Sequence, residues 1–122
     1  MKLGDAFLMA VPPNFDREHL FFVISDPAKN AGTFIIANIT GDEIRAGREC
    51  VLVRGDHPWI VKESFVTFTD ALEITPAHAQ KIDALMGTTI KPQPCLSAEI
   101  LTKIVQAAKT SKAIPVDFKK YL

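Results

Sequence analysis

The residues best suited to proton transfer in this chain are two of its histidines, His19 and His57. His57 lies in the turn 55–59, in which Asp56 can orient the imidazole ring and Pro58 restricts the backbone. Because histidine can gain or lose a proton near neutral pH, we interpret this turn as a candidate catalytic segment. The alternative is that both histidines are ordinary surface or half-buried polar residues.

Several polar residues lie at the ends of predicted strands or in the adjoining loops, where they can join such a site. Thr40 ends an apolar run, Arg45 lies in a charged loop, and Ser64 opens a later strand. Arg17 lies in the polar loop just before His19. We regard these residues as candidate companions of the histidines.

The two cysteines, Cys50 and Cys95, follow no metal-binding spacing and are expected to be free thiols in a reducing compartment. Cys50 can act as a nucleophile with His57 as its base, or it can be a small core residue. A zinc site would need His19, His57, Cys50 and Asp56 to meet by chance, so we expect no metal and no cofactor. The sequence also lacks a Gly-rich phosphate loop and the H-E-x-x-H, C-x-x-C and G-x-S-x-G motifs, which argues against several familiar enzyme classes.

Length and composition are those of one globular domain. The chain has 122 residues, 48% of them hydrophobic, and a net charge of zero. Zero net charge gives no general attraction to nucleic acid, although residues 96–122 carry five lysines against two acidic residues. No apolar run approaches the roughly 20 residues needed to span a bilayer, and Asp5 and Pro12 interrupt the N-terminal segment. We therefore expect a cytoplasmic protein that does not associate with a membrane.

The first two-thirds of the chain predict a β-rich unit. Strands are predicted at the short apolar runs rich in aromatic and β-branched residues, at 7–11, 19–25, 33–40, 50–53 and 64–69. Residues 26–32 have turn chemistry, which predicts an antiparallel hairpin between the second and third runs. The last run alternates, with Thr67 and Thr69 expected on a solvent-facing side. Together these signals favour a mainly β, α+β fold built on a small, partly closed antiparallel barrel.

The last third of the chain predicts helices. Thr75 can cap a helix that starts at Pro76 and stops before Gly87. Ser97 can cap a second helix, whose apolar positions are Ile100, Leu101, Ile104, Val105 and Ala108. We therefore expect a single domain over residues 1–122, with a β-barrel at 1–74 and a helical part at 75–122 that covers one side or end of it.

The order of several short segments carries a resemblance to a known family. The segments are Gly4-Asp5 at the start of a strand, Ser25 and Ile39-Thr40 at the ends of the next two, Glu63-Ser64-Phe65-Val66, and Asp70-Ala71-Leu72. Over roughly residues 4–110 they resemble the toxins of the MazF/PemK family. The resemblance implies a small SH3-like barrel with a C-terminal helix that cleaves single-stranded RNA, forms a homodimer and binds an antitoxin-like protein.

The chain departs from the family pattern at two places. The family has a catalytic arginine in an Arg-Pro pair at the start of its second strand, where this chain has His19-Leu20 with Arg17 just before them. Thr40 matches the family's serine or threonine after the third strand, whereas the turn at 56–59 has no family equivalent. The resemblance therefore bears on the fold more directly than on the activity.

The functional hypothesis is a metal-independent endoribonuclease toxin or an RNA-binding relative of one. In it, His19 and His57 share the acid and base roles, and the catalytic set is completed by Arg17 and Thr40. The predicted binding residues are Arg45, Asp56, Trp59 and Ser64. The alternative is a non-catalytic protein-interaction module of the same fold, and a third hypothesis is a small hydrolase that uses His57 and Cys50.

Overall fold

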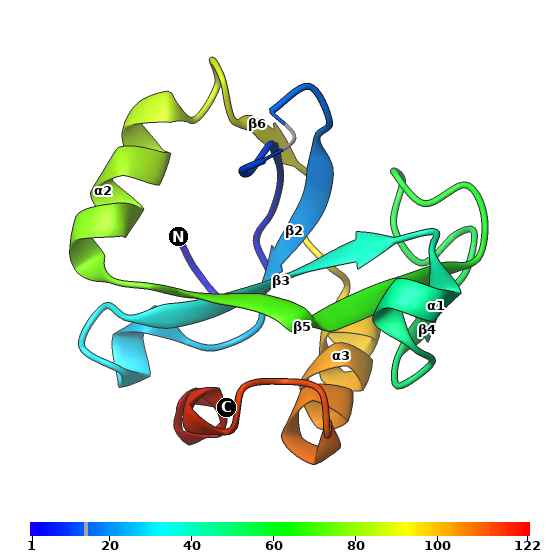
Figure 1. The fold of residues 1–122 in the computed structure, drawn as a ribbon. Helices are drawn as coiled ribbons and strands as arrows, with labels where there is room; N and C mark the ends of the chain where they lie inside the picture. The colour runs from blue at the N-terminus through cyan, green and yellow to red at the C-terminus, as the bar shows by residue number, and fades with distance from the viewer. Residues whose placement is uncertain (14) are drawn as a thin grey trace.

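The computed structural model describes residues 1–13 and 15–122, which form a mixed α/β fold around one curled sheet. Its strands are β1 (Ala6–Met9), β2 (His19–Val23), β3 (Phe34–Thr40), β4 (Val51–Leu52), β5 (Ser64–Ile74) and β6 (Lys91–Gln93). Its helices are α1 (Glu43–Ala46), α2 (Pro76–Leu85) and α3 (Ala98–Thr110), with 3-10 segments η1 (Pro27–Lys29) and η2 (Val116–Tyr121). The strands follow the order β4-β5-β3-β2-β1-β6, every pair is antiparallel, and the sheet curls into a half-barrel (Figure 1).

The predicted hairpin is confirmed, because β2 pairs with β3 in antiparallel register with Phe21 opposite Asn38. The longest strand, β5, then pairs with β3 on the other side. That pairing shifts register between Ile36 and Asn38, an irregularity of the kind that bends a strand and increases its twist. The bend lets one continuous strand follow the curl of the sheet.

The sheet does not end at residue 74, where the sequence placed the boundary between strands and helices. Residues 91–93 lie in the part of the chain expected to be helical, yet they form β6 and pair with β1. Pro92 lacks a backbone donor, and it is tolerated because β6 is an edge strand with a neighbour on one side only. A short strand that contains proline has little apolar pattern, which is why the sequence did not reveal it.

Both long helices begin where their capping residues predicted. The Thr75 hydroxyl accepts a hydrogen bond from the His78 amide, and the Ser97 hydroxyl accepts one from the Ile100 amide. The prediction that Arg45 lies in a loop is wrong, since Arg45 belongs to the short helix α1. The Asp42 carboxylate caps this helix by accepting from the amides of Ile44 and Arg45.

One face of the sheet, which we call the covered face, carries Leu20 and Phe22 and packs against α3. The helix buries Ile100, Ile104 and Ala108 against it, as their spacing predicted. In Figure 1 α3 and the C-terminal segment lie beneath the sheet, opposite α2. This face therefore holds the larger core of the domain.

The other face, which we call the open face, carries Phe21 and Asn38, because neighbouring residues of a strand point to opposite sides. Helix α2 covers one end of it, where Ile82 packs in a second, smaller core that also contains Phe21. Thr67 lies opposite Asn38 and is buried, so the prediction that it faces solvent is wrong, whereas Thr69 is exposed. The curl of the sheet shelters Thr67, and sequence alternation alone does not report curvature.

Candidate functional site

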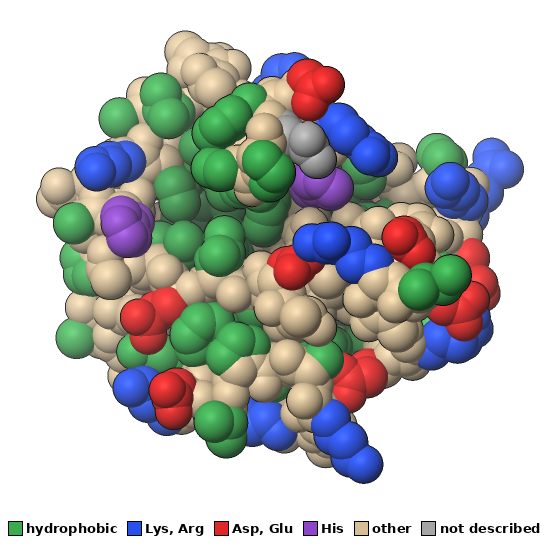
Figure 2. Space-filling model, viewed as in Figure 1, with side chains coloured by type: hydrophobic (Ala, Val, Ile, Leu, Met, Phe, Trp, Pro, Cys, Tyr) green, Lys and Arg blue, Asp and Glu red, His purple; other side chains and the backbone are tan. Residues whose placement is uncertain are grey.

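The open face contains a pocket of about 1120 Å³ beyond the end that α2 covers. Pockets that bind small ligands commonly have volumes of roughly 300–1,000 Å³, so this one has room for a ligand of nucleotide size. Its lining includes His19 from β2, Asn38 and Thr40 from β3, and Thr67 from β5. Figure 2 shows this face, with a hollow that has hydrophobic walls next to a group of basic and acidic side chains.

The floor of the pocket has two polar atoms without a partner. Asn38 is 7% exposed and Thr67 is 1% exposed. The Asn38 Oδ1 and Thr67 Oγ1 atoms have no hydrogen-bond partner among the described residues. Because a buried polar atom without a partner costs about 1–3 kcal/mol, a polar ligand that these side chains turn toward would gain by supplying the missing hydrogen bonds.

The rim of the pocket carries more basic than acidic groups. Arg17, Arg45 and Lys62 are exposed there, and the carboxylates are those of Asp42 and Asp70. The Asp42 carboxylate accepts two backbone hydrogen bonds at the start of α1 and is thus occupied within its own loop. The excess of cations favours an anionic ligand.

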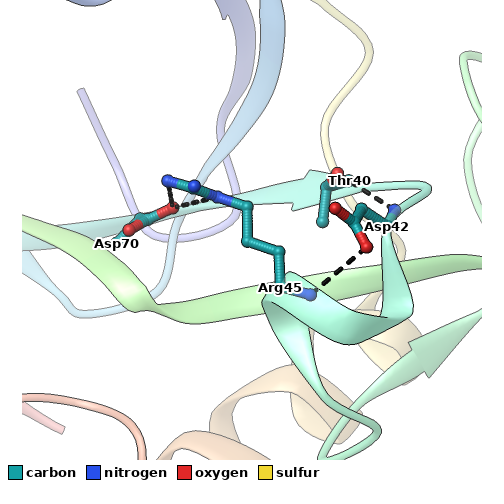
Figure 3. A network of polar contacts seen from close by, with 4 residues as sticks. All are labelled: Thr40, Asp42, Arg45 and Asp70. Carbon is teal, nitrogen blue, oxygen red and sulfur yellow. Dashed lines mark hydrogen bonds and ion pairs between the residues drawn. The ribbon is translucent and has the colours of Figure 1, made fainter.

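Arg45 reaches from α1 across to β5, where its Nε and Nη2 atoms donate to Asp70 Oδ2 at 3.1 and 2.7 Å (Figure 3). The Arg45 side chain is 62% exposed in this ion pair. Exposed ion pairs of this kind contribute about 0–1 kcal/mol to stability. Arg45 can therefore turn from Asp70 to an anion in the pocket at little cost.

Thr40 and Asp42 form the corner between β3 and α1 (Figure 3). The Thr40 Oγ1 atom accepts a hydrogen bond from the Asp42 amide at 3.1 Å. This contact uses the hydroxyl oxygen and leaves its hydrogen free to be donated. Thr40 can thus present a donor to a ligand on the open face.

His57 lies on the covered face of the sheet, whereas the pocket lies on the open face. It is 2% exposed and packs edge-on against Phe22 of the covered face, with ring centroids 5.9 Å apart. Its Nε2 lies 2.7 Å from the Pro94 carbonyl oxygen, and its Nδ1 accepts from the Trp59 amide at 3.0 Å. These partners fix the tautomer with hydrogen on Nε2, so both ring nitrogens are engaged in holding loops together. The structure does not bring His57 to His19, and the two cannot act on one phosphate.

The three remaining candidates are Asp56, Ser64 and Trp59, and none of them lies in the pocket. Asp56 Oδ2 accepts from the Val53 amide at 2.8 Å and closes the turn. The Ser64 hydroxyl is buried and donates to the Lys62 carbonyl at 3.0 Å. Trp59 is 41% exposed and does not line the pocket. Four of the eight predicted site residues, Arg17, His19, Thr40 and Arg45, therefore share the pocket, and four do not.

Cys50 is buried in the core of the covered face, and Cys95 is exposed; neither forms a disulfide. Burial raises the pKa of the Cys50 thiol to about 11. A thiol with so high a pKa carries almost no thiolate at neutral pH. This argues against Cys50 as a nucleophile and supports its interpretation as a core residue.

The prediction missed most of the pocket lining, and four of the missed polar residues matter for the site: Asn38, Lys62, Thr67 and Asp70. One of them carried a signal in the sequence, because Asn38 is the one strongly polar residue within the apolar run of β3. A polar side chain in a strand buried on both faces needs a hydrogen-bond partner. The other three lie in β5 or in the loop before it, and their place in the pocket depends on how β5 pairs with β3.

Among residues 1–13 and 15–122, no three His, Cys, Asp or Glu side chains gather closely enough to hold a metal ion. In the same part of the chain, no helix has both the length and the apolar character needed to cross a membrane. Compared with models of known protein families and with curated proteins, the chain matches none.

Proposed function

We propose that this protein is an SH3-like barrel of the MazF/PemK type that binds single-stranded RNA in the pocket of the open face and cleaves it. The observation that carries the proposal is the coincidence, in one pocket, of three rim cations with a floor of unpartnered polar atoms. Cations at a rim suit phosphates, and polar atoms in a floor suit the edges of a base or sugar. A nucleotide chain offers both kinds of group.

The phosphate contacts are assigned to Arg17, Lys62 and Arg45. All three side chains are exposed on the rim, and Arg45 is held there by a weak ion pair. Contacts of this kind release counterions from the nucleic acid, so binding should weaken steeply as salt is added. The net charge of zero does not oppose this, because what matters at close range is the local excess of cations.

Cleavage is assigned to His19, the histidine of the pocket. The His19 imidazole takes the proton of a 2′-hydroxyl as the 2′-oxygen bonds to phosphorus. The bond from phosphorus to the 5′-oxygen breaks, and the leaving oxygen takes a proton from water, which gives a 2′,3′-cyclic phosphate and a free 5′-hydroxyl. Arg17 and the Thr40 hydroxyl stabilise the charge that develops on the phosphate oxygens.

The test is cleavage of a single-stranded RNA labelled at both ends, in the presence of a chelator, by the wild type and two histidine variants. His19→Gln should lower the rate by about 100-fold or more, the usual contribution of a general base. His78→Gln is the matched control, because His78 is exposed on α2 and does not line the pocket. Equal cleavage by wild type and His19→Gln, or none by the wild type, would contradict the catalytic assignment.

A second candidate is a non-catalytic protein-interaction module, and exposed apolar side chains in α1 and in the loop before β5 favour it. Ile44 is 98% exposed, Val61 is 72% exposed and Trp59 is 41% exposed. Such residues are typical of a surface that meets another protein, either a second copy of this chain or an antitoxin-like protein. Sedimentation of the wild type and Val61→Asp tests the first case, since a dimer that forms through this segment should dissociate in the variant.

A further inference from the structure

We infer that Asn38 and Thr67 read the Watson–Crick edge of one unpaired base at the floor of the pocket. The inference rests on the proposed RNA binding and adds to it a residue pair that sets specificity. It predicts that RNA is held at two levels, with phosphates at the rim and one base below them.

Asn38 and Thr67 lie directly opposite each other on neighbouring strands, so their side chains stand side by side on the open face. Both are more than nine-tenths buried, and both line the pocket. Their positions are set by sheet register instead of by a loop, which is how a fold holds a recognition pair rigidly.

The Asn38 Oδ1 atom is an acceptor, and the Thr67 hydroxyl can donate or accept. Together they match a ligand edge with a donor beside an acceptor. Every nucleobase has such a pair on its Watson–Crick edge, whereas a phosphate has acceptors alone and would leave Asn38 Oδ1 without a donor.

The charged side chains and the neutral polar side chains occupy different levels of the pocket. The side chains of Arg17, Arg45 and Lys62 are exposed at the rim, whereas Asn38 and Thr67 are buried and neutral. A phosphate therefore has its partners at the rim, and the floor is left for an uncharged polar group. Since a duplex already uses the Watson–Crick edge of each base, the ligand has to be single-stranded.

The experiment measures binding of short labelled RNAs by fluorescence anisotropy, in a His19→Gln background so that the RNA stays intact. One RNA carries a single base flanked by abasic nucleotides, in four versions that differ in that base. A fifth RNA is abasic throughout and keeps every phosphate and 2′-hydroxyl. The comparison thus separates recognition of the base from recognition of the backbone and the sugar.

At least one base should bind about tenfold or more tightly than the fully abasic RNA, which is the size expected for one or two buried hydrogen bonds. Thr67→Val and Asn38→Leu, which nearly preserve side-chain volume, should remove most of that preference and leave binding of the abasic RNA unchanged. Thr89→Val is the matched control, because Thr89 is exposed and does not line the pocket. Thermal unfolding shows that the variants fold, and Thr67→Val should be at least as stable as the wild type, since it removes a hydroxyl without a partner.

Two results would overturn the inference, and they differ in what they say of the proposed function. If the protein binds the abasic and base-containing RNAs equally, or if Thr67→Val keeps the full preference, the base-reading pair is refuted and RNA binding stands. If no RNA binds, or if Arg17→Ala and Lys62→Ala leave binding unchanged, RNA binding in the pocket fails and the base-reading pair fails with it.

Discussion

The two faces of the curled sheet use the same strands for different purposes. On the covered face, apolar side chains of β2, β3 and β5 pack against α3, and the one buried histidine has both ring nitrogens hydrogen-bonded. On the open face, Asn38 and Thr67 are just as deeply placed and have no partner among the described residues. The buried histidine is therefore fully hydrogen-bonded on one side of the sheet, whereas two buried polar atoms on the other side lack a partner.

His57 and His19 illustrate the difference. The sequence around His57 has more unusual chemistry, yet its aspartate closes a turn and its imidazole joins two loops. His19 follows Glu18 of an ordinary polar loop, and it lies in the pocket with Arg17 and Thr40. A turn rich in polar and aromatic residues can have a purely structural role. A histidine at the start of a strand, in a less unusual sequence, can be the one that lines a binding pocket.

The largest expected effect is on the free energy of unfolding, and it distinguishes α3 on the covered face from α2 on the open face. Ile104→Ala on α3 should lower the free energy of unfolding by about 3 to 4 kcal/mol, because Ile104 is fully buried in the core of the covered face. Leu85→Ala on α2, a half-exposed position, should cost less than about 1 kcal/mol. Urea denaturation of both variants measures this, and similar losses would show that the open face is as tightly packed as the covered one.

The next effect separates the two histidines. His57→Ala should lower the free energy of unfolding by about 2 to 3 kcal/mol, because it leaves a cavity beside Phe22 and removes the partners of the Pro94 carbonyl and the Trp59 amide. His19→Ala should change it by less than about 0.5 kcal/mol. If His57→Ala folds with wild-type stability, the structural role of His57 is refuted.

A smaller effect concerns Glu49, which ties the end of α3 to the loop before β4. Its carboxylate accepts from the Ser111 hydroxyl at 2.6 Å and from the Lys112 amide at 2.8 Å. Partial burial pushes the pKa of Glu49 upward, but these hydrogen bonds outweigh it and lower the pKa below its ordinary value. Glu49→Gln should therefore cost about 1 kcal/mol at neutral pH.

The pH dependence of that loss has a definite sign. Because the folded-state pKa of Glu49 is lowered, its contribution is present above the ordinary pKa of 4.5 and is lost as the pH falls through the folded-state value. Urea denaturation of the wild type and Glu49→Gln at several pH values should show the two curves converging in acid. A difference that stayed constant down to low pH would contradict the account.

The smallest effect is one of reactivity, with no change in stability. Cys95 is exposed and should react with a thiol reagent at mildly alkaline pH within minutes, whereas Cys50 is buried with its pKa raised to about 11 and should react on unfolding. Counting the thiols modified in the native protein and in denaturant tests this. Cys95→Ser is the control, and it should show no fast-reacting thiol.

The sequence predicted the parts of the fold that are encoded locally. The caps at Thr75 and Ser97, the hairpin between β2 and β3 and the apolar face of α3 each depend on residues a few positions apart. It missed α1, which is a single turn, and β6, which contains a proline and forms because β1 provides a partner. The burial of Thr67 was missed for a similar reason, since the curvature that shelters it comes from the whole sheet.

The sequence predicted those residues of the candidate site whose position depends on local features, and it missed those that depend on long-range strand pairing. Arg17, His19, Thr40 and Arg45 lie at strand ends or in loops, and polar residues in such places were recognised from sequence. The floor of the pocket depends on Asn38 lying opposite Thr67, and register between β3 and β5 is a long-range property. The turn at 55–59 was selected for its residue types, but the hydrogen bonds of Asp56 and His57 go to the surrounding backbone.

The most direct test of the difference between the faces is a titration of the isotopically labelled protein with single-stranded RNA, followed by the backbone amide resonances. If the open face binds RNA, the largest shifts should fall on Asn38, Thr40, Arg45 and Thr67, and the resonances of α3 should stay in place. The largest shifts along α3, or no shifts at all, would contradict the account.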